Sequence, residues 1–331
     1  EVKRHTDTEH GEIALRLRGR RRLDGIARIL GDAANADYYA KRAKNYEKLW
    51  HPESRFFRPR DAEGAFIEPL GGLPDVAPHL NRLSEEGVFF TRCYANSFRT
   101  DRGLICALSG YPSFPKTSVM KSTARSQKLP SLASELAKAG YTNTFLYGGD
   151  ITNMRGYLYS TGYKRIIADK DFSAEERSTH RWGAGDDIVL DRLYDVIEEQ
   201  DNEPWHITCL TLSSHEPWSV PYTRIEGDKI ANSFAFTDEE FGKFVERFRQ
   251  SDKWDNTLII CISDHSVVGY PKGITQNDRN RNHIPLLLLG GAVKEAKRIG
   301  TLCNQQDLVA TILPQLGLSG KEFPFSRNIL S

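Results

Sequence analysis

The sequence predicts an α/β fold with a central, mostly parallel sheet that carries helices on both faces, preceded by a helical N-terminal segment. Two observations support this fold class. From about residue 75 onward, short apolar runs alternate with segments whose apolar residues recur at helical spacing, and helices that recur between strands favour parallel pairing. The chain of 331 residues is also 39% hydrophobic, which is enough for a large core.

The predicted strands are apolar runs rich in β-branched or aromatic residues, and each stops at polar or glycine-rich sequence. They cover residues 88–94, 142–147, 205–212, 257–263 and 284–289. The predicted helices have apolar residues three or four positions apart, and one is closed by Gly140, a common helix terminator. They cover residues 104–108, 132–139, 186–200, 238–249 and 305–316.

Residues 1–70 differ from the rest of the chain. Helical periodicity runs over residues 24–50, a turn marked by proline and arginine follows over residues 51–60, and no strong strand is present. Glycine and proline at residues 71–74 mark a boundary. We therefore expect a helical segment, a foreign or fused fragment, before the boundary and a catalytic domain over residues 71–331.

Charge and cysteine content exclude several classes of protein. A net charge of +1 gives the whole molecule no affinity for polyanions, so no nucleic-acid partner is expected. The local exception is the five arginines within residues 16–22, which form either a solvated face or a basic binding arm. The five cysteines show no C-x-x-C pair, which argues against a zinc knuckle or a disulfide framework. The sequence contains no run of about 18 apolar residues and no leader pattern, so we expect neither a membrane anchor nor an export signal in this chain.

Asp264 and His265 directly follow the apolar strand at residues 257–263. Open α/β sheets bind ligands at the carboxyl ends of their strands, and a carboxylate beside an imidazole is a typical metal-binding pair. The alternative is a structural aspartate at a strand end next to a surface histidine. Residues at the ends of other strands are needed to decide between them.

Three further polar residues follow predicted strands. Thr100 lies at the start of a helical stretch, where free backbone N–H groups favour an anion, and it is either the helix N-cap or a nucleophile. His215 follows the strand at 205–212 and is either a proton donor to a substrate or a structural loop residue. Arg155 is either a phosphate clamp or a surface arginine. Together these residue types suit a metal-assisted group transfer at phosphorus or sulfur.

Residues 71–331 resemble the extracytoplasmic catalytic domain of the sulfatase-like phosphoglycerol transferases, which form the lipoteichoic acid synthase family within the alkaline phosphatase superfamily. The resemblance lies in residues 74–87, 94–103, 108–112, 213–217 and 263–265. It implies the alkaline phosphatase fold and a monomer at the extracytoplasmic face of the bacterial inner membrane. It also implies a phospholipid head group as donor and an alcohol or glycan as acceptor at the membrane surface.

The resemblance also implies a role for each candidate residue. Thr100 would be nucleophile and metal ligand, Asp264 and His265 would complete much of a site for one divalent metal, Mn or Mg, and His215 and Arg155 would hold the phosphoglycerol head group. The implied reaction is a double displacement. Thr100 attacks the phosphorus of a phosphatidylglycerol-like lipid, diacylglycerol leaves, and an alcohol then takes the phosphoglycerol from the threonine.

True sulfatases share this fold but use a cysteine or serine in a C/S-x-P/A-x-R context. The corresponding run here begins at Thr100, so sulfate-ester hydrolysis is not expected. Phosphoethanolamine transfer also uses a threonine and remains an alternative.

The sequence departs from this family at its beginning. The family's domain opens with an apolar strand that ends in an acidic metal ligand, and we find no such strand before residues 74–87. Residues 30–70 instead resemble a piece of a bacterial α-mannosidase with an (α/α)-barrel, and Glu68 or Asp75 would have to replace the absent ligand. Two further hypotheses are therefore a non-catalytic chimera and a binding module that uses the basic arm.

Overall fold

The computed structural model describes residues 50–51, 56–57, 70–73, 75–201, 203–267 and 278–330. The chain divides into two compact units, Glu1–Asp61 and Ala62–Ser331. In the first unit the described residues form an antiparallel pair of β1 (Trp50–His51) and β2 (Phe56–Phe57). Trp50, the last residue of the helix predicted over 24–50, is thus a strand residue, and the rest of that helix, the arginine run and Glu68 lie outside the described residues.

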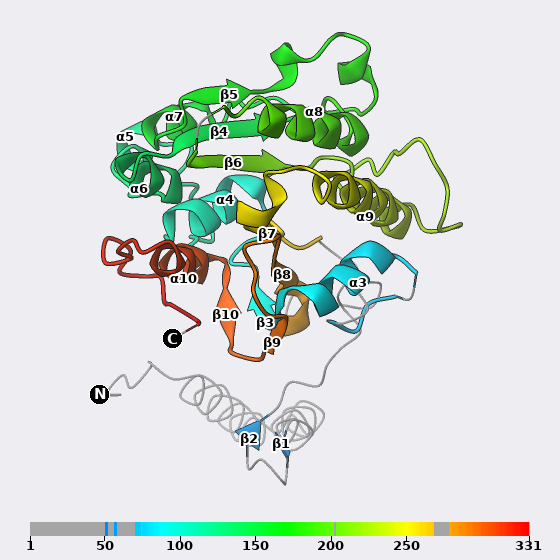
Figure 1. Cartoon of the computed structure of the whole chain (residues 1–331). Coiled ribbons are helices and arrows are strands. Elements are labelled where there is room, and N and C mark those ends of the chain that lie inside the picture. Colours follow the sequence, from blue (N-terminus) through cyan, green and yellow to red (C-terminus); the bar gives the residue numbers. More distant parts are fainter. Residues whose placement is uncertain are drawn as a thin grey trace, which may run out of the picture. The chain divides into compact units, whose positions relative to one another are not determined.

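The described residues of the second unit form two sheets (Figure 1). One is parallel throughout and has the order β5 (Arg165–Ile167), β4 (Thr142–Tyr147), β6 (Trp205–Leu210). The other has the order β10 (Cys303–Asn304), β3 (Val88–Tyr94), β8 (His283–Leu289), β7 (Ile259–Ile262), and β9 (Lys297–Ile299) also pairs with β3. Four of these six pairings are parallel, and only the two that involve β8 are antiparallel. The predicted mostly parallel α/β architecture is therefore confirmed.

Helices cover both faces of these sheets. They are α3 (Pro78–Glu86), α4 (Thr100–Ser109), α5 (Thr123–Ser126), α6 (Leu132–Lys138), α7 (Arg155–Ser160), α8 (Asp186–Glu198), α9 (Lys229–Phe248) and α10 (Leu308–Gln315). Short 3₁₀ helices lie at Asp169–Asp171, Glu176–Ser178, Trp254–Asn256, Arg279–Asn282 and Gln305–Asp307. Apolar residues of α8 and α9 pack on one face of β6 and β7, while α4 and α10 supply apolar residues to the clusters on the opposite face.

All five predicted strands form, and their ends lie within two residues of the prediction. The helix predicted over 238–249 begins earlier, at Lys229, because Asp228 caps it. The Asp228 carboxylate accepts hydrogen bonds from the N–H groups of Ile230 (3.1 Å) and Ala231 (3.0 Å). Helix α3 was not predicted, because only two residues of its sequence, Leu80 and Leu83, are apolar at helical spacing.

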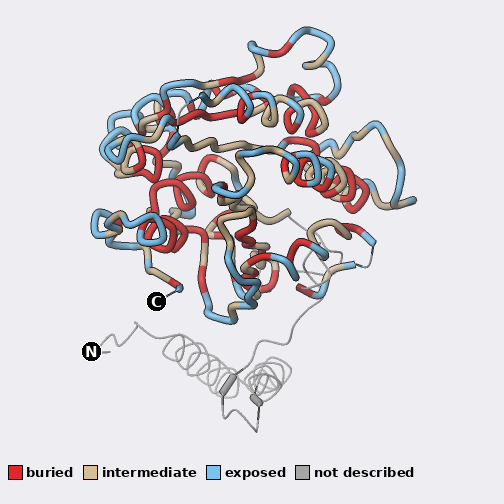
Figure 2. The backbone as a smooth tube through the Cα atoms, in the orientation of Figure 1, coloured by how far each residue is buried: buried red, intermediate tan, exposed pale blue. Residues whose placement is uncertain are grey.

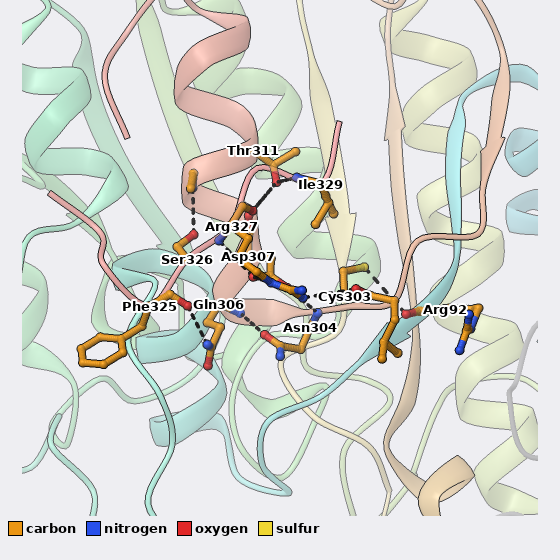
Figure 3. A network of polar contacts seen from close by, with 12 residues as sticks. Arg92, Cys303, Asn304, Gln306, Asp307, Thr311, Phe325, Ser326, Arg327 and Ile329 are labelled. Atoms are coloured by element: carbon orange, nitrogen blue, oxygen red, sulfur yellow. Dashed lines mark hydrogen bonds and ion pairs between the residues drawn. The ribbon is translucent and has the colours of Figure 1, made fainter. Parts of the chain in front are cut away.

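A polar network fixes the C-terminal turn to α10 (Figure 3). The fully buried Asp307 carboxylate accepts hydrogen bonds from the backbone N–H (3.0 Å) and Nη2 (2.8 Å) of Arg327. Thr311 donates to the Asp307 carbonyl at 2.7 Å and accepts from the Ile329 N–H at 3.2 Å. Because each buried polar group here has a partner, the turn closes this end of the domain without an unpaired charge.

We expect acid to destabilise the domain through His206 on β6. Burial lowers the pKa of His206 from 6.5 to about 4, and its ring contacts Asn143 Oδ1 at 2.8 Å and Thr208 Oγ1 at 3.1 Å. Above pH 6.5 the ring is neutral in both states and has no effect. Between pH 6.5 and 4 only the unfolded chain gains the proton, so the free energy of unfolding falls, by up to about 3 kcal/mol.

Urea unfolding of the wild type and of His206→Gln at a series of pH values tests this expectation. Glutamine cannot take up the proton. The free energy of unfolding of the variant should therefore fall less steeply between pH 6.5 and 4, by the contribution of one proton. Parallel pH profiles for the two proteins would contradict it.

Candidate active site

Asp264 and His265 lie in the loop that follows β7, and both are half-buried. The His265 Nδ1–H donates to the Ser266 carbonyl at 2.9 Å, because a carbonyl can only accept. The neutral ring therefore carries its lone pair on Nε2, which lies 3.5 Å from Asp264 Oδ2. The lone pairs of Asp264 Oδ2 and His265 Nε2 can therefore share either a proton carried by the imidazole or a cation bound by both.

Thr100 is the first residue of α4 and not its N-cap, so the capping alternative is wrong. The N-cap is Arg99, which makes no side-chain capping hydrogen bond, and the structure gives the half-buried Thr100 hydroxyl no partner among the described residues. The first turn of α4 leaves backbone N–H groups unpaired, and these attract an anion. The hydroxyl is therefore free to react or bind at a position that favours phosphate.

Gly103 brings the first turn of α4 against the end of β7. A Cβ atom added at this position would lie 1.7 Å from the Asp264 carbonyl oxygen and 2.7 Å from its carbonyl carbon. Only glycine permits this approach, and Gly103 is one helical turn beyond Thr100. The contact therefore packs the first turn of α4, which Thr100 opens, against the backbone of Asp264. A glycine inside an apolar helical stretch is the sequence signal for such an approach.

Gln305 joins the segments that carry these groups. Its fully buried side chain donates from Nε2 to the carbonyls of Ser263 (2.7 Å) and Asp264 (2.6 Å). Its Oε1 accepts from the N–H of Asn96 at 2.9 Å, in the loop before α4. The sequence predicts Gln305 only as the start of a helix, and no local pattern distinguishes this residue from a surface glutamine.

Gln305→Glu should lower both stability and activity. A carboxylate keeps the acceptor for Asn96 but places negative oxygens against two carbonyls that have lost their donors. We expect about 2–4 kcal/mol of destabilisation in urea unfolding. The exposed Gln127→Glu is the matched control and should stay within about 0.5 kcal/mol of the wild type. A Gln305→Glu protein as stable as this control would show that Gln305 does not clamp the site.

His215 lies in the loop after β6, and buried Asp186 holds that loop. The Asp186 carboxylate accepts from the N–H groups of Leu212 (2.6 Å) and Ser213 (3.0 Å) and from Thr237 Oγ1 (2.6 Å). Burial raises the pKa of Asp186, and these hydrogen bonds oppose the rise. The sequence predicts Asp186 only as the start of a helix, and no local pattern marks this aspartate as buried.

The exposed His215 ring donates from Nδ1 to the Glu216 carbonyl at 2.9 Å. Trp182 Nε1 donates to the same carbonyl at 2.7 Å, and its ring meets the His215 ring edge-on at 5.9 Å. These contacts orient the imidazole so that its Nε2 remains available at the surface. In the neutral ring this Nε2 carries the lone pair, so His215 is held to accept a proton and, once protonated, to donate it or to bind an anion.

His180 lies beside this loop and was not predicted. The Trp182 N–H donates to His180 Nδ1 at 3.3 Å, which places the proton of the neutral ring on Nε2. That Nε2 is buried and has no partner among the described residues. Burial lowers the pKa of His180, the Asp186 charge opposes this, and the His215 charge adds to it. A neutral, unpaired donor thus accompanies His215.

Tyr147, the last residue of β4, lies within electrostatic reach of both Asp264 and Asp186. Burial, and then the charges of Asp264, Asp186 and Asp150, raise the pKa of Tyr147 at this strand end. The ends of β4 and β7 are therefore within electrostatic reach of each other. Arg155, at the start of α7, is exposed. The pKa of Asp150 is lowered first by hydrogen bonds from Thr152, and the charge of Arg155 adds to this lowering. No described contact joins Arg155 to the other candidates.

The donor set for a metal is incomplete among the described residues. They contain no group of three or more histidine, cysteine, aspartate or glutamate residues that could hold a metal ion. Asp264, His265 and the Thr100 hydroxyl supply three donor atoms with one charge, whereas hard divalent cations take about six oxygen-rich ligands. Asp75, which was expected to replace the absent acidic ligand, is exposed on the loop before α3. It belongs to no group of three or more potential metal ligands among the described residues.

A family model described as Sulfatase matches residues 61–318. The chain belongs to the sulfatase family. This match covers the two sheets and every candidate residue of the site. The structure of a protein in the alkaline phosphatase superfamily from Vibrio parahaemolyticus aligns with a TM-score of 0.73 and 26% identity over 80% of this chain and 66% of that chain.

Curated relatives of this sulfatase-family chain include phosphoglycerol transferase I from Shigella flexneri and from Escherichia coli. Each is 25% identical over 266 residues, which is 74% of this chain and 35% of the relative. The chain thus spans about a third of the length of these relatives. The lipoteichoic acid synthase LtaP from Listeria monocytogenes has the same fold, with a TM-score of 0.69 and 16% identity over 77% of this chain and 69% of that chain.

A second family model, described as the glycosyl hydrolase family 92 catalytic domain, matches residues 22–89. It agrees with the glycosidase-like resemblance of residues 30–70, most of which lie outside the described residues. No helix in the described part of the chain has the length and apolar character needed to cross a membrane.

Proposed function

We propose that this chain carries a phosphoglycerol-type transferase domain in which Thr100 is the nucleophile. The observation that supports the proposal is the contact of Gly103 with Asp264, which packs the helix that begins at Thr100 against the strand end that carries Asp264 and His265. Curated relatives that match 74% of the chain are phosphoglycerol transferases, which supports the general reaction. The donor would be a phospholipid head group and the acceptor an alcohol or glycan, at the extracytoplasmic face of the bacterial inner membrane.

The proposed reaction is a double displacement at phosphorus. The Thr100 hydroxyl gives its proton to a water molecule as its Oγ1 bonds to the phosphorus, and the bond from phosphorus to the diacylglycerol oxygen breaks. His215 in its protonated form gives its Nε2 proton to the leaving alkoxide, and the free N–H groups of α4 attract the phosphoryl oxygens. In the second half, the acceptor's hydroxyl gives its proton to the now neutral His215 and displaces Thr100 from phosphorus, and Thr100 regains a proton from water. Arg155 would bind the head group from the exposed start of α7.

We propose Thr100, Asp264 and His265 as ligands of one divalent metal, Mn or Mg, as expected for a sulfatase-like enzyme. The lone-pair arrangement of Asp264 Oδ2 and His265 Nε2 supports this. Because the described donors are fewer than a divalent cation takes, no step of the proposed reaction depends on the metal. The same shortfall favours a second candidate function, a sulfatase-like domain that binds head groups but turns over slowly or not at all.

Incubation of the full chain with Mn²⁺, fluorescent phosphatidylglycerol and glycerol as acceptor separates these candidates. Transfer predicts fluorescent diacylglycerol and a phosphoglycerol adduct on the peptide that contains Thr100, detected by mass spectrometry. A parallel arm with phosphatidylethanolamine tests the alternative head group, and an aryl sulfate ester tests hydrolysis at sulfur. Head-group binding without diacylglycerol or adduct would favour the second candidate.

A further inference from the structure

Two of the chain's five cysteines, Cys93 and Cys303, lie side by side on neighbouring strands. Cys93 is on β3 and Cys303 opens β10, and the parallel pairing of these strands sets the two residues directly opposite each other. Both side chains are buried in the same apolar cluster, so they point to the same face of the sheet. No sequence spacing predicts this pair, because the two residues are far apart in the chain.

The separation of neighbouring strands suits a disulfide. Such strands lie about 4.8 Å apart, and the Cα atoms of disulfide-bonded cysteines are about 4.4–6.8 Å apart. Both thiols are free in the structure, and a side-chain hydrogen bond joins them. Two sulfur atoms within hydrogen-bonding reach need only a small movement to form a bond.

The two thiols differ in acidity. The hydrogen bond from Cys93 lowers the pKa of Cys303. The charges of Arg327 and Arg92 lower it further, whereas burial and the charge of Asp307 oppose the change. The same hydrogen bond, together with burial, raises the pKa of Cys93. Figure 3 shows Cys303 between the Arg92 carbonyl, which its Sγ contacts at 3.8 Å, and the ion pair of Asp307 with Arg327. Because the thiolate is the attacking species in disulfide exchange, Cys303 is the more reactive partner.

The other three cysteines lack this acidity. Burial raises the pKa of Cys106, Cys209 and Cys261 to about 12, so their thiols stay protonated and inert. Access also favours Cys303, because β10 is only two residues long and follows the exposed residues 300–302. A short strand beside an exposed loop opens more easily than a core strand, and opening of β10 brings Cys303 to an oxidant.

The cysteine pair also lies next to the residue that joins the parts of the candidate site. Gln305 follows Cys303 by two residues, and its side chain contacts the Asp264 carbonyl and the Asn96 N–H. Asn96 in turn follows Cys93 by three residues. A covalent bond between β3 and β10 therefore fixes both of the segments that carry this contact.

We propose that Cys93 and Cys303 are a modification site that a disulfide oxidant converts to a disulfide, and that this bond fixes Gln305 at the candidate site. The Cys303 thiolate attacks one sulfur of the oxidant, and the thiolate that leaves takes up the proton that Cys303 lost. The Cys93 sulfur then attacks Cys303 in the mixed disulfide, and the second half of the oxidant leaves with the Cys93 proton. Two electrons and two protons thus pass to the oxidant, which leaves as two thiols. The effect on the site rests on the proposed function, whereas the disulfide does not.

The test uses the full chain with oxidised glutathione, added to the folded protein in one sample and present during refolding in another. After free thiols are blocked with iodoacetamide, trypsin places Cys93 on peptide 93–99 and Cys303 on peptide 299–321. We expect these two peptides to be linked and two of the five free thiols to be lost. Five free thiols in both samples, or a disulfide that joins another pair instead, would overturn the proposal.

Serine variants test the two roles separately. Cys93→Ser lacks the second thiol, so we expect it to accumulate a mixed disulfide of Cys303 with glutathione, detected by intact mass. Cys303→Ser lacks the attacking thiol, and Cys93 should stay unmodified. Cys209→Ser is the matched control and should form the disulfide as the wild type does. Equal glutathione addition to the Cys93→Ser and Cys303→Ser variants would contradict the assignment of Cys303 as the attacking residue.

Hydrogen exchange of the oxidised and reduced proteins measures the effect on the site. In the oxidised protein the amides of residues 303–305 and of Asn96 should exchange about tenfold more slowly or less, whereas β5, an edge strand of the other sheet, should not change. Equal exchange in the two forms would overturn the effect on Gln305. A mapped disulfide with no diacylglycerol release in either form would count against the transferase and not against the disulfide.

Discussion

Gly103→Ala should lower the free energy of unfolding by about 3 kcal/mol or more and disable the site. The added methyl group would lie 1.7 Å from the Asp264 carbonyl oxygen. Neither side can give way easily, since Gly103 is in α4 and the Asp264 carbonyl is held by Gln305 Nε2 at 2.6 Å. Alanine favours helix over glycine by about 1 kcal/mol, but this gain is smaller than the cost of the overlap.

Urea unfolding and head-group binding measure this effect. Gly300→Ala is the matched control, because its added Cβ would meet only Thr91 Oγ1, at 4.0 Å. The control should unfold like the wild type. If Gly103→Ala matched it in stability and binding, α4 and the end of β7 would not be in contact, and the geometry proposed for the site would be wrong.

Thr100→Ala should abolish transfer, by about 10⁴-fold or more, and leave stability unchanged within about 0.5 kcal/mol. Loss of a nucleophile removes the covalent route, whereas loss of an N-cap would cost about 1 kcal/mol of stability. Thr100 makes no capping hydrogen bond, so we expect only the first effect. Diacylglycerol release and urea unfolding, measured on the same samples, separate the two roles.

Thr100→Ser is the matched variant, since it keeps a hydroxyl on the first residue of α4. It should retain measurable transfer and form the covalent adduct. Equal residual activity in the alanine and serine variants would point to direct attack by the acceptor, without a phospho-threonine intermediate. If Thr100→Ala lost stability and Thr100→Ser did not, the Thr100 hydroxyl would have a structural role.

The sequence predicted the fold and the identity of several candidate residues. Apolar runs rich in β-branched residues identified all five strands that carry the core, because burial on both faces leaves a continuous apolar pattern. Polar residues immediately after these runs identified Thr100, His215 and Asp264–His265. Helix α3 and the true start of α9 were missed, because the first has few apolar residues and the second begins at a cap that we had not used, Asp228.

Other parts of the candidate site depend on partners that are distant in the chain. Gln305 joins residues 96 and 264, and Asp186 joins the His215 loop to α9 through Thr237. A glutamine at the start of a helix and an aspartate in a first turn are common on protein surfaces, so their sequences carry no signal of burial. His180 was missed for the same reason, since its unpaired Nε2 is a property of its surroundings.

By itself, the sequence determined the α/β class, the order of the strands along the chain and the polar residues at their ends, because strand burial and side-chain chemistry are local properties. It also predicted that a first strand is absent. Only the tertiary structure decided that Thr100 is not a cap, that Gly103 brings the first turn of α4 against Asp264, and that β6 and β7 lie under the same helices. These features arise from contacts between residues far apart in the chain, and no local pattern encodes them.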